Sequence, residues 1–310
     1  MARDKITIVG AGNVGATTAY IAATKQLGDI VLLDIVEGLA EGKALDMAEA
    51  SPVQLYDSDV TGTLDWEKTA DSNIVIITSG VPRKPGMSRD DLLTKNVQIV
   101  KETSEKTAKY SPNSIIIVVS NPLDAMVYTA AKVTGFAKNR IMGMAGALDS
   151  ARFSYFLACE LGVSVEDVKC VLMGGHGDDM VPLPRFTCVS GIPISELLDE
   201  EKIAELIDRT RKGGTEVVNL LGHSAYYAPA AGTVKMAEAI LKDKKTVMSC
   251  CAYCGREYGV GGYFVGVPVV LGKNGVEKII ELDLNESEQS QFEKSLAHVK
   301  QLAAKVDKLL

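Results

Sequence analysis

Histidine is scarce in this chain. Only His176, His223 and His298 occur among its 310 residues, so proton transfer near neutral pH has few side chains to carry it. Basic residues are outnumbered as well: the chain has 33 Lys and Arg but 40 Asp and Glu, so its formal net charge is −7. No basic run interrupts this balance, which argues against a nucleic-acid partner and against binding to an anionic membrane surface.

Long apolar runs are missing too. No run reaches the roughly 18 residues that a transmembrane helix needs. The opening residues also lack the apolar stretch and cleavage site of a signal peptide. We therefore expect a cytoplasmic protein with no membrane partner and with its six cysteines reduced. Cys250, Cys251 and Cys254 have no second Cys-x-x-Cys and no neighbouring histidine, so we interpret them as thiols on or near a strand, with no metal.

The first half of the chain alternates apolar runs with helical stretches. Helical patterns over 13–27, 91–110 and 123–133 separate apolar runs at 6–10, 30–35, 74–80, 114–121 and 140–144. The runs do not alternate with polar residues, as is typical of parallel strands covered by helices on both faces. The length fits about two domains. We predict that residues 1–145 form an α/β Rossmann domain with a doubly wound parallel sheet.

In residues 146–310 the predicted helices and strands no longer alternate regularly. Helices are predicted over 149–161, 200–221, 226–241 and 286–310, with β-rich runs at 168–175 and 181–190. Two long β-rich segments, 246–254 and 262–272, are typical of an antiparallel pair. We therefore predict an α+β catalytic domain with antiparallel strands, which begins near residue 146.

A glycine-rich sequence follows the first predicted strand and opens the first predicted helix. It reads Gly10-Ala11-Gly12-Asn13-Val14-Gly15. In such a turn the first glycine permits the bend, the second lets the backbone approach a pyrophosphate, and the third lets helix and strand pack closely. Asp34 ends the next strand, where a carboxylate binds the adenosine ribose. Because Asp34 would repel a 2′-phosphate and no arginine follows it, NAD is favoured over NADP.

His176 stands between glycines in GGHGDDM (174–180). Flanking glycines let the backbone and a ligand come close to the ring, so His176 is the best candidate for a general acid/base. Three further segments carry charged or polar residues, namely VPRKPGMSR (81–89), SNPLD (120–124) and LDSARF (148–153). Taken singly, each also fits a structural role as a surface loop, an Asn-Pro turn or a capped helix start.

Together these segments resemble the lactate/malate dehydrogenase superfamily. GAGNVG, VPRKPGMSR, VVSNPLD, LDSARF and GGHGDDMVPL occur in the order and spacing of that family. The resemblance continues through YYAPAA (226–231) and EYGVGGYFVGVPVVLG (257–272), so it covers nearly the whole chain. The chain is most similar to the lactate-dehydrogenase-like malate dehydrogenases found mainly in bacteria and archaea.

The resemblance implies roles for five residues. His176 would take the substrate hydroxyl proton during oxidation and return it during reduction, and Asp149 would hold the imidazole tautomer. Arg152 would bind the C1 carboxylate in a bidentate fork. Arg89 would polarise the C2 carbonyl, and Asn121 would hydrogen-bond near the substrate oxygen.

The nicotinamide half of the cofactor site is also implied by the resemblance. Its expected lining is Asn96, Val119, Ser120 and Asn121. Hydride would move between C2 of the hydroxy acid and C4 of the nicotinamide. A mobile loop carrying Arg83 and Arg89 would close over the substrate and expel water.

Arg83 favours malate and oxaloacetate over lactate and pyruvate. In the superfamily, lactate dehydrogenases usually carry Gln at this position and malate dehydrogenases carry Arg, which can pair with the second carboxylate of oxaloacetate. Ala225 favours the same assignment, because lactate dehydrogenases often have Thr there. The resemblance also implies a homo-oligomer, either a dimer or a tetramer.

Three other functions stay open as alternatives. L-lactate dehydrogenase is the nearest, and parallel assays of oxaloacetate and pyruvate separate the two. An NAD-dependent glycosidase of the Rossmann type would use a metal site after Cys-Asn-Pro, whereas this chain reads Ser120-Asn121-Pro122. A non-catalytic dinucleotide-binding protein would not need His176 and Asp149 together with the arginines, and an NADH-absorbance assay distinguishes it.

Overall fold

A parallel sheet forms the first half of the chain. In this computed structural model, which describes residues 3–82 and 88–310, six strands lie side by side in the order β3-β2-β1-β4-β5-β6. They are β1 (Lys5–Val9), β2 (Asp29–Leu33), β3 (Val60–Thr63), β4 (Ile74–Ile77), β5 (Ile115–Val118) and β6 (Ile141–Gly143). Ile6 of β1 lies beside Ile30 on one side and Ile74 on the other. The strand order reverses at β1, which confirms the predicted Rossmann fold and marks the crevice where such folds bind ligands.

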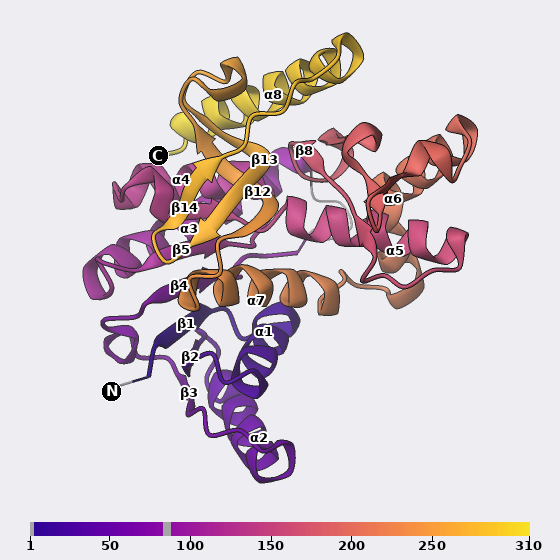
Figure 1. Ribbon diagram of the computed structural model, residues 1–310. Helices are drawn as coiled ribbons and strands as arrows, with labels where there is room; N and C mark the ends of the chain where they lie inside the picture. Colours follow the sequence, from indigo (N-terminus) through magenta and orange to yellow (C-terminus); the bar gives the residue numbers. More distant parts are fainter. Residues whose placement is uncertain (1–2, 83–87) are drawn as a thin grey trace.

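Helices cover both faces of this sheet (Figure 1). One face carries α1 (Asn13–Thr24), α2 (Leu39–Gln54) and α7 (Tyr227–Leu241), and the other carries α3 (Arg89–Tyr110) and α4 (Leu123–Thr134). Ile74 and Ile76 pack in the core with α1 and α7, whereas Val75 and Ile77 pack with α3 and α4. Both sides of the strands other than the edge strand β3 are therefore buried, which explains the unbroken apolar runs.

The sheet continues into the second half of the chain. β6 pairs antiparallel with β12 (Thr246–Cys254), which pairs along its length with β13 (Tyr263–Gly272), as predicted. Beyond β13 the sheet continues with β8 (Leu172–Gly174), which pairs with β13, and then β9 (Met180–Pro182), which pairs with β8. β14 (Gly275–Ile279) also pairs with β13. A second, three-stranded sheet contains β7 (Val168–Lys169), β10 (Cys188–Val189) and β11 (Ile192–Pro193).

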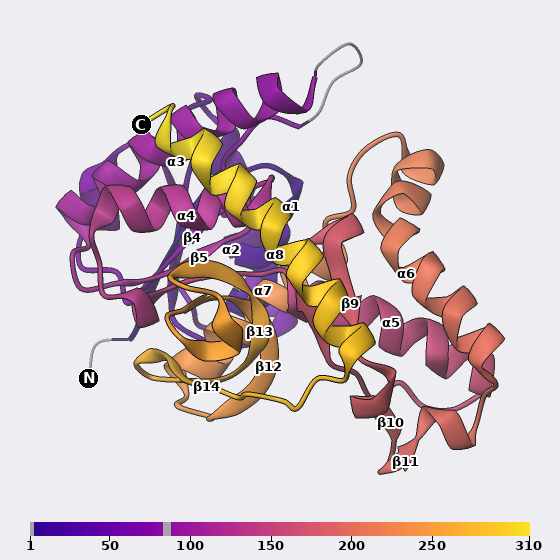
Figure 2. The same cartoon turned by 90° about the horizontal axis from the view of Figure 1, so that it is seen from above.

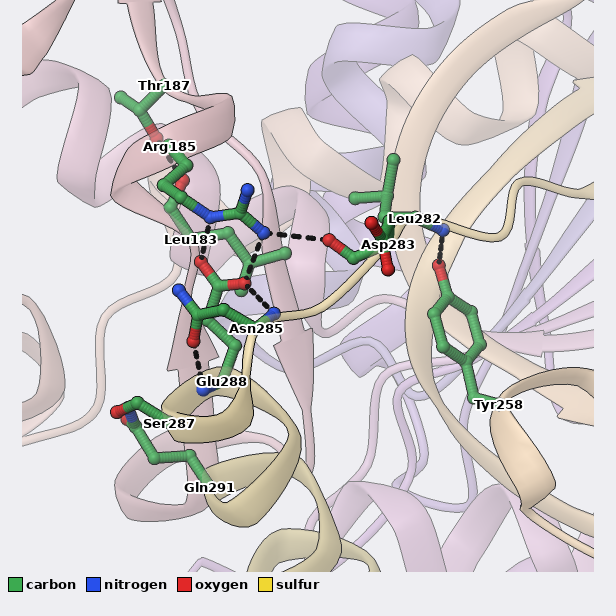
Figure 3. A network of polar contacts seen from close by, with 10 residues as sticks. All are labelled: Leu183, Arg185, Thr187, Tyr258, Leu282, Asp283, Asn285, Ser287, Glu288 and Gln291. Carbon is green, nitrogen blue, oxygen red and sulfur yellow. Dashed lines mark hydrogen bonds and ion pairs between the residues drawn. The ribbon is translucent and has the colours of Figure 1, made fainter.

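Three helices complete the second half, and one of them reaches back to the first. They are α5 (Gly146–Leu161), α6 (Glu200–Leu221) and α8 (Glu286–Asp307). Figure 2 shows α8 running from the neighbourhood of β9 to that of α3 and α4. Its first turn carries Glu288, which pairs with Arg185 after β9 (Figure 3), and its last residue, Asp307, accepts a hydrogen bond from Tyr128 of α4.

Several element boundaries differ from the predicted ones. α2 and β3 are not predicted, because exposed Leu45 and Val53 blur the apolar face of α2 and β3 is a short edge strand. α3 begins two residues earlier than predicted and α5 three residues earlier. The predicted terminal helix ends at Asp307, three residues short of the chain end.

The cysteines of the 250–254 segment lie on a strand, as the sequence indicates. Cys250, Cys251 and Cys254 are buried on β12, and all six cysteines are thiols without a disulfide partner. Among residues 3–82 and 88–310, no group of three His, Cys, Asp or Glu side chains is placed to hold a metal ion. In the same part of the chain, every helix is too short or too polar to cross a membrane.

Candidate active site

The glycine-rich turn lies between β1 and α1. Gly10 has a φ of +107°, and a Cβ at this position would come within 2.7 Å of the Thr78 hydroxyl. A Cβ at Gly15 would lie 1.8 Å from the Gly10 carbonyl oxygen, so close packing requires both glycines. A Cβ at Gly12 would meet nothing within 4 Å, so the turn is open at Gly12. This arrangement fits a pyrophosphate lying against Gly12.

The start of α1 also fits an anionic ligand. Asn13 and Val14 open the helix, Gly12 is its N-cap, and no described side chain caps it or places a negative charge in its first turn. By contrast, Ser88 caps α3 and Asp199 caps α6 with a side-chain oxygen. Backbone N–H groups at the start of α1 are therefore available to a phosphate, and the helix dipole favours its charge.

Asp34 links the end of β2 to the glycine-rich turn. Its Oδ2 accepts the N–H of Ala11 at 2.5 Å, and its Oδ1 accepts the N–H groups of Ile35 and Val36 at 2.8 and 3.1 Å. The Lys43 ammonium donates to the Ala11 carbonyl at 2.7 Å. The sequence carried no signal for Lys43, because the pattern did not predict α2.

The residues predicted for the nicotinamide side meet at the carboxyl ends of β4 and β5. Asn96 is buried, donates to the Asn121 carbonyl at 2.6 Å, and exchanges hydrogen bonds with the main chain of Val81. Ser120, also buried, donates to the Ser79 carbonyl at 2.6 Å and so joins the ends of the two strands. Val119 is buried in the same place and Asn121 is exposed. The side chains of Asn96 and Ser120 therefore hold the main chain of this region in place through hydrogen bonds.

His176, Asp149 and Arg152 form one cluster. His176 follows β8, and the other two lie one turn apart near the start of α5. His176 Nδ1 is 2.9 Å from Asp149 Oδ2, and Arg152 Nη1 is 3.6 Å from Asp149 Oδ1. The side chain of Asp149 is only 3% exposed, against 19% for His176 and 16% for Arg152. The carboxylate is thus shielded from water, and the His176 imidazole and the Arg152 guanidinium border it.

This geometry sets the protonation chemistry of His176. A carboxylate only accepts hydrogen bonds, so Nδ1 carries its proton toward Asp149 and Nε2 is the atom that can exchange a proton with a substrate. Burial opposes the charged imidazolium, but Asp149 and Asp124 favour it, and the pKa of His176 is raised above its ordinary value. Burial also lowers the pKa of Arg152, against the opposing effect of Asp149.

Arg89 opens α3 instead of lying in the preceding loop. Ser88 and Asp91 form a capping box that starts the helix there. Arg89 Nη2 is 3.8 Å from Asp178 Oδ2, two residues after His176, and both side chains are largely exposed. Arg89 is therefore near the His176 loop but faces the surface. Arg83, predicted to bind the second substrate carboxylate, lies outside the described residues.

The other two histidines lie elsewhere. His223 is exposed, with Nδ1 3.0 Å from the Ser224 carbonyl. His298 of α8 pairs with Asp179, at the end of the loop that carries His176. Ser295 of α8 also holds this loop, because its hydroxyl accepts the Gly175 N–H at 2.7 Å. Sequence reasoning missed Ser295, since nothing local connects it with a loop more than a hundred residues away.

Comparisons with known proteins identify the family of this chain. Residues 4–143 match the model of the lactate/malate dehydrogenase NAD binding domain, and residues 146–309 match that of the alpha/beta C-terminal domain. The chain belongs to the lactate/malate dehydrogenase family. It is 58% identical to a malate dehydrogenase of Rhodopirellula baltica, over 100% of this chain and 99% of that protein.

Two solved structures of the family are similar over almost their whole length. Malate dehydrogenase from Picrophilus torridus in its apo form has a TM-score of 0.97 and 49% identity, covering 99% of this chain and 98% of that one. Lactate dehydrogenase from Cryptosporidium parvum, complexed with lactic acid and nicotinamide adenine dinucleotide, has a TM-score of 0.96 and 43% identity, with 99% of both chains covered. Membership of this family makes the chain an NAD-dependent oxidoreductase, and NAD is its cofactor.

Proposed function

We propose that this chain catalyses the reversible oxidation of (S)-malate to oxaloacetate with NAD. The observation that carries the proposal is the His176–Asp149–Arg152 cluster, in a chain whose full length matches malate dehydrogenases. A base and a guanidinium that both border one orienting carboxylate suit a hydroxy acid, which must lose a proton while its own carboxylate is held.

Each residue of the cluster has a separate task in this mechanism. His176 Nε2 accepts the malate hydroxyl proton during oxidation and returns it during reduction. Asp149 keeps Nδ1 protonated and stabilises the imidazolium that forms. Arg152 holds the C1 carboxylate, and Arg89 moves from Asp178 to the developing oxyanion at C2. Bound NAD supplies the hydride acceptor, while Gly10–Gly15 and Asp34 hold its adenosine and pyrophosphate half.

The remaining assignments describe the assembled enzyme. We propose that residues 1–145 bind the cofactor, with Asn96 and Val119–Asn121 beside the nicotinamide, and that residues 146–310 bind the substrate. We also propose that the chain acts as a homo-oligomer in the cytoplasm. Light scattering on the purified protein tests the assembly, and a mass equal to one chain would overturn it.

Replacing His176 tests the chemistry. His176→Asn removes the proton acceptor but leaves the nucleotide turn intact, so turnover of malate and oxaloacetate should disappear while NADH still binds. Activity is followed by NADH absorbance and binding by NADH fluorescence. A variant that keeps activity near the wild-type level would rule out His176 as the acid/base.

Replacing Arg83 tests the substrate. Arg83→Gln removes the guanidinium proposed to pair with the second carboxylate, so kcat/KM should fall for oxaloacetate and rise for pyruvate. We expect at least the roughly tenfold loss that corresponds to 1.4 kcal/mol. If kcat/KM for oxaloacetate stays within about threefold of wild type, Arg83 does not select the substrate. A wild-type enzyme that prefers pyruvate would instead favour the lactate dehydrogenase alternative.

A further inference from the structure

A buried carboxylate lies behind the catalytic loop. Asp124, in the first turn of α4, is 7% exposed. Its Oδ2 accepts the main-chain N–H of His176 at 3.1 Å. Its Oδ1 has no hydrogen-bond partner of ordinary geometry among the described residues, and the buried Cys251 thiol is the side chain that lies near the carboxylate. Burying a carboxylate with so few strong donors is costly, so its presence needs an explanation.

The loop is shaped to bring its backbone against this carboxylate. A Cβ at Gly175 would lie 3.3 Å from Asp124 Oδ2 and 3.2 Å from the Asp179 Cβ, so glycine gives the close approach. On the opposite side, Ser295 of α8 accepts the Gly175 N–H. Two successive N–H groups of the loop are thus held by α4 and α8, and the imidazole of His176 projects from this fixed backbone toward Asp149.

Several charged and titratable groups surround Asp124 and His176. Those that act on Asp124 are His176, Asp179 and Cys251. Those that act on the imidazole of His176 are Asp149, Asp124 and Arg152. Three more groups reach the loop from packed helices, namely His298 at Asp179, Arg89 at Asp178 and Arg211 at the Met180 carbonyl.

We propose that Asp124 is a positioning residue, which fixes the backbone at His176 and places a second negative charge behind the imidazole. Asp124 thereby sets the pH range over which His176 exchanges its proton. The proposal rests on the proposed role of His176 as the acid/base.

The charge of Asp124 matters beyond its hydrogen bond. An amide oxygen could accept the same N–H without the cost of a buried charge, so the bond alone does not explain a carboxylate. Burial raises the pKa of Asp124, against the hydrogen bond and the charge of His176, which favour the ionised form. A negative Asp124 favours the imidazolium, so its removal should lower the pKa of His176.

Asp124→Asn separates charge from hydrogen bonding. In the full-length, ¹⁵N-histidine-labelled protein, we expect the His176 titration midpoint to fall by about one pH unit. Loss of one signal in His176→Asn assigns the resonance. The rise of kcat/KM for malate with pH, and its fall for oxaloacetate, should both move to lower pH by the same amount.

Controls separate this effect from a loss of structure. Asp307→Asn makes the same change of charge at the far end of α8 and should leave the His176 midpoint unchanged. Asp124→Ser is a second neutral variant and should shift the midpoint in the same direction as Asp124→Asn does. A midpoint that matches wild type in a folded neutral variant would overturn the proposal. The titration needs no turnover, so it can be read even if His176→Asn proves active and the proposed function fails.

Discussion

Gly213 of α6 leaves room for the Arg152 side chain. A Cβ at Gly213 would lie 3.1 Å from Arg152 Cδ, closer than ordinary contact. A Cβ at the next residue, Gly214, would lie 3.8 Å from the guanidinium, which is an ordinary distance. Adjacent glycines in the middle of a helix lower helix stability, so a close approach by another side chain gives a reason for Gly213.

We therefore expect Gly213→Ala to weaken substrate binding. The new methyl group would push Arg152 by a few tenths of an ångström from its place beside Asp149. The expected result is a rise in KM for oxaloacetate and a fall in kcat/KM of about tenfold. Gly214→Ala is the matched control, because it makes the same gain in helix propensity without the close contact. Equal kinetics in the two variants would show that Gly213 does not position Arg152.

The predicted proximity of Asp149 and Arg152 is confirmed, because it depends on local helix geometry alone. Asp149 and Arg152 are three residues apart on one helix, so their shared face follows from helix geometry, and the structure places them 3.6 Å apart. Asp124 and Gly213 were not predicted as parts of the site. Asp124 lies within a motif that the sequence singled out, but its contact with His176 spans 52 residues, and no local pattern encodes such a contact.

At the scale of elements, α8 depends on the way it begins. The Asn285 side chain caps the helix by accepting the Glu288 N–H at 2.9 Å, and the Glu288 carboxylate accepts the Asn285 N–H at 2.9 Å. The Glu288 carboxylate also accepts two hydrogen bonds from Arg185, at 2.7 and 3.0 Å, and Arg185 bonds the Asp283 carbonyl as well (Figure 3). This network fixes the start of the helix whose middle holds the His176 loop through Ser295.

Glu288→Gln should therefore destabilise the fold in a pH-dependent way. Arg185 holds the pKa of Glu288 below its ordinary value. A carboxylate with a lowered pKa contributes stability above its unfolded pKa, near 4.3, and loses it as the pH falls through the folded value. We expect a loss of about 1 kcal/mol at pH 7, or roughly 2 °C in Tm.

The pH dependence is checked by thermal unfolding between pH 3 and pH 8. The difference between Glu288→Gln and wild type should shrink as the pH falls below about 4.3 and should vanish only below the lowered pKa of the folded protein. Glu286→Gln changes an exposed carboxylate in the same first turn and should have a much smaller effect. A difference that stays constant down to pH 3 would contradict a contribution from the ionised carboxylate.

At the scale of the whole molecule, α1 and α7 join the cofactor half to the second half. Glu238 of α7 is only 13% exposed on its side chain, and its carboxylate lies 3.0 Å from Lys25 at the end of α1. Lys242 and Lys244 pair with the same carboxylate. Hydrogen bonds from Lys244 and Lys25 lower the pKa of Glu238 to about 2. The Glu238 carboxylate, which links α7 to α1 through Lys25, is thus surrounded by three lysines that favour its ionised form.

Glu238→Gln should loosen this junction at neutral pH. Because the folded pKa is about 2 and the unfolded pKa near 4.3, the stabilisation is complete above about pH 5 and is lost as the pH falls toward 2. We expect unfolding free energy to fall by about 2 kcal/mol at pH 7, after allowing for the half-exposed lysines. Urea unfolding measures this free energy, and the control is Glu49→Gln, which changes an exposed carboxylate on α2. An equal loss in both variants would show that the junction is not involved.

The sequence by itself determined the fold class and the local motifs. Unbroken apolar runs require strands buried on both faces, the glycine pattern requires a tight turn before a helix, and three residues of helix place Asp149 beside Arg152. Only the tertiary structure decided what meets these motifs from far along the chain. α4 and α8 hold the loop of His176, α6 makes room for Arg152, and β12 extends the Rossmann sheet at β6. Such contacts depend on how distant elements pack, and that packing leaves no periodic pattern in the sequence.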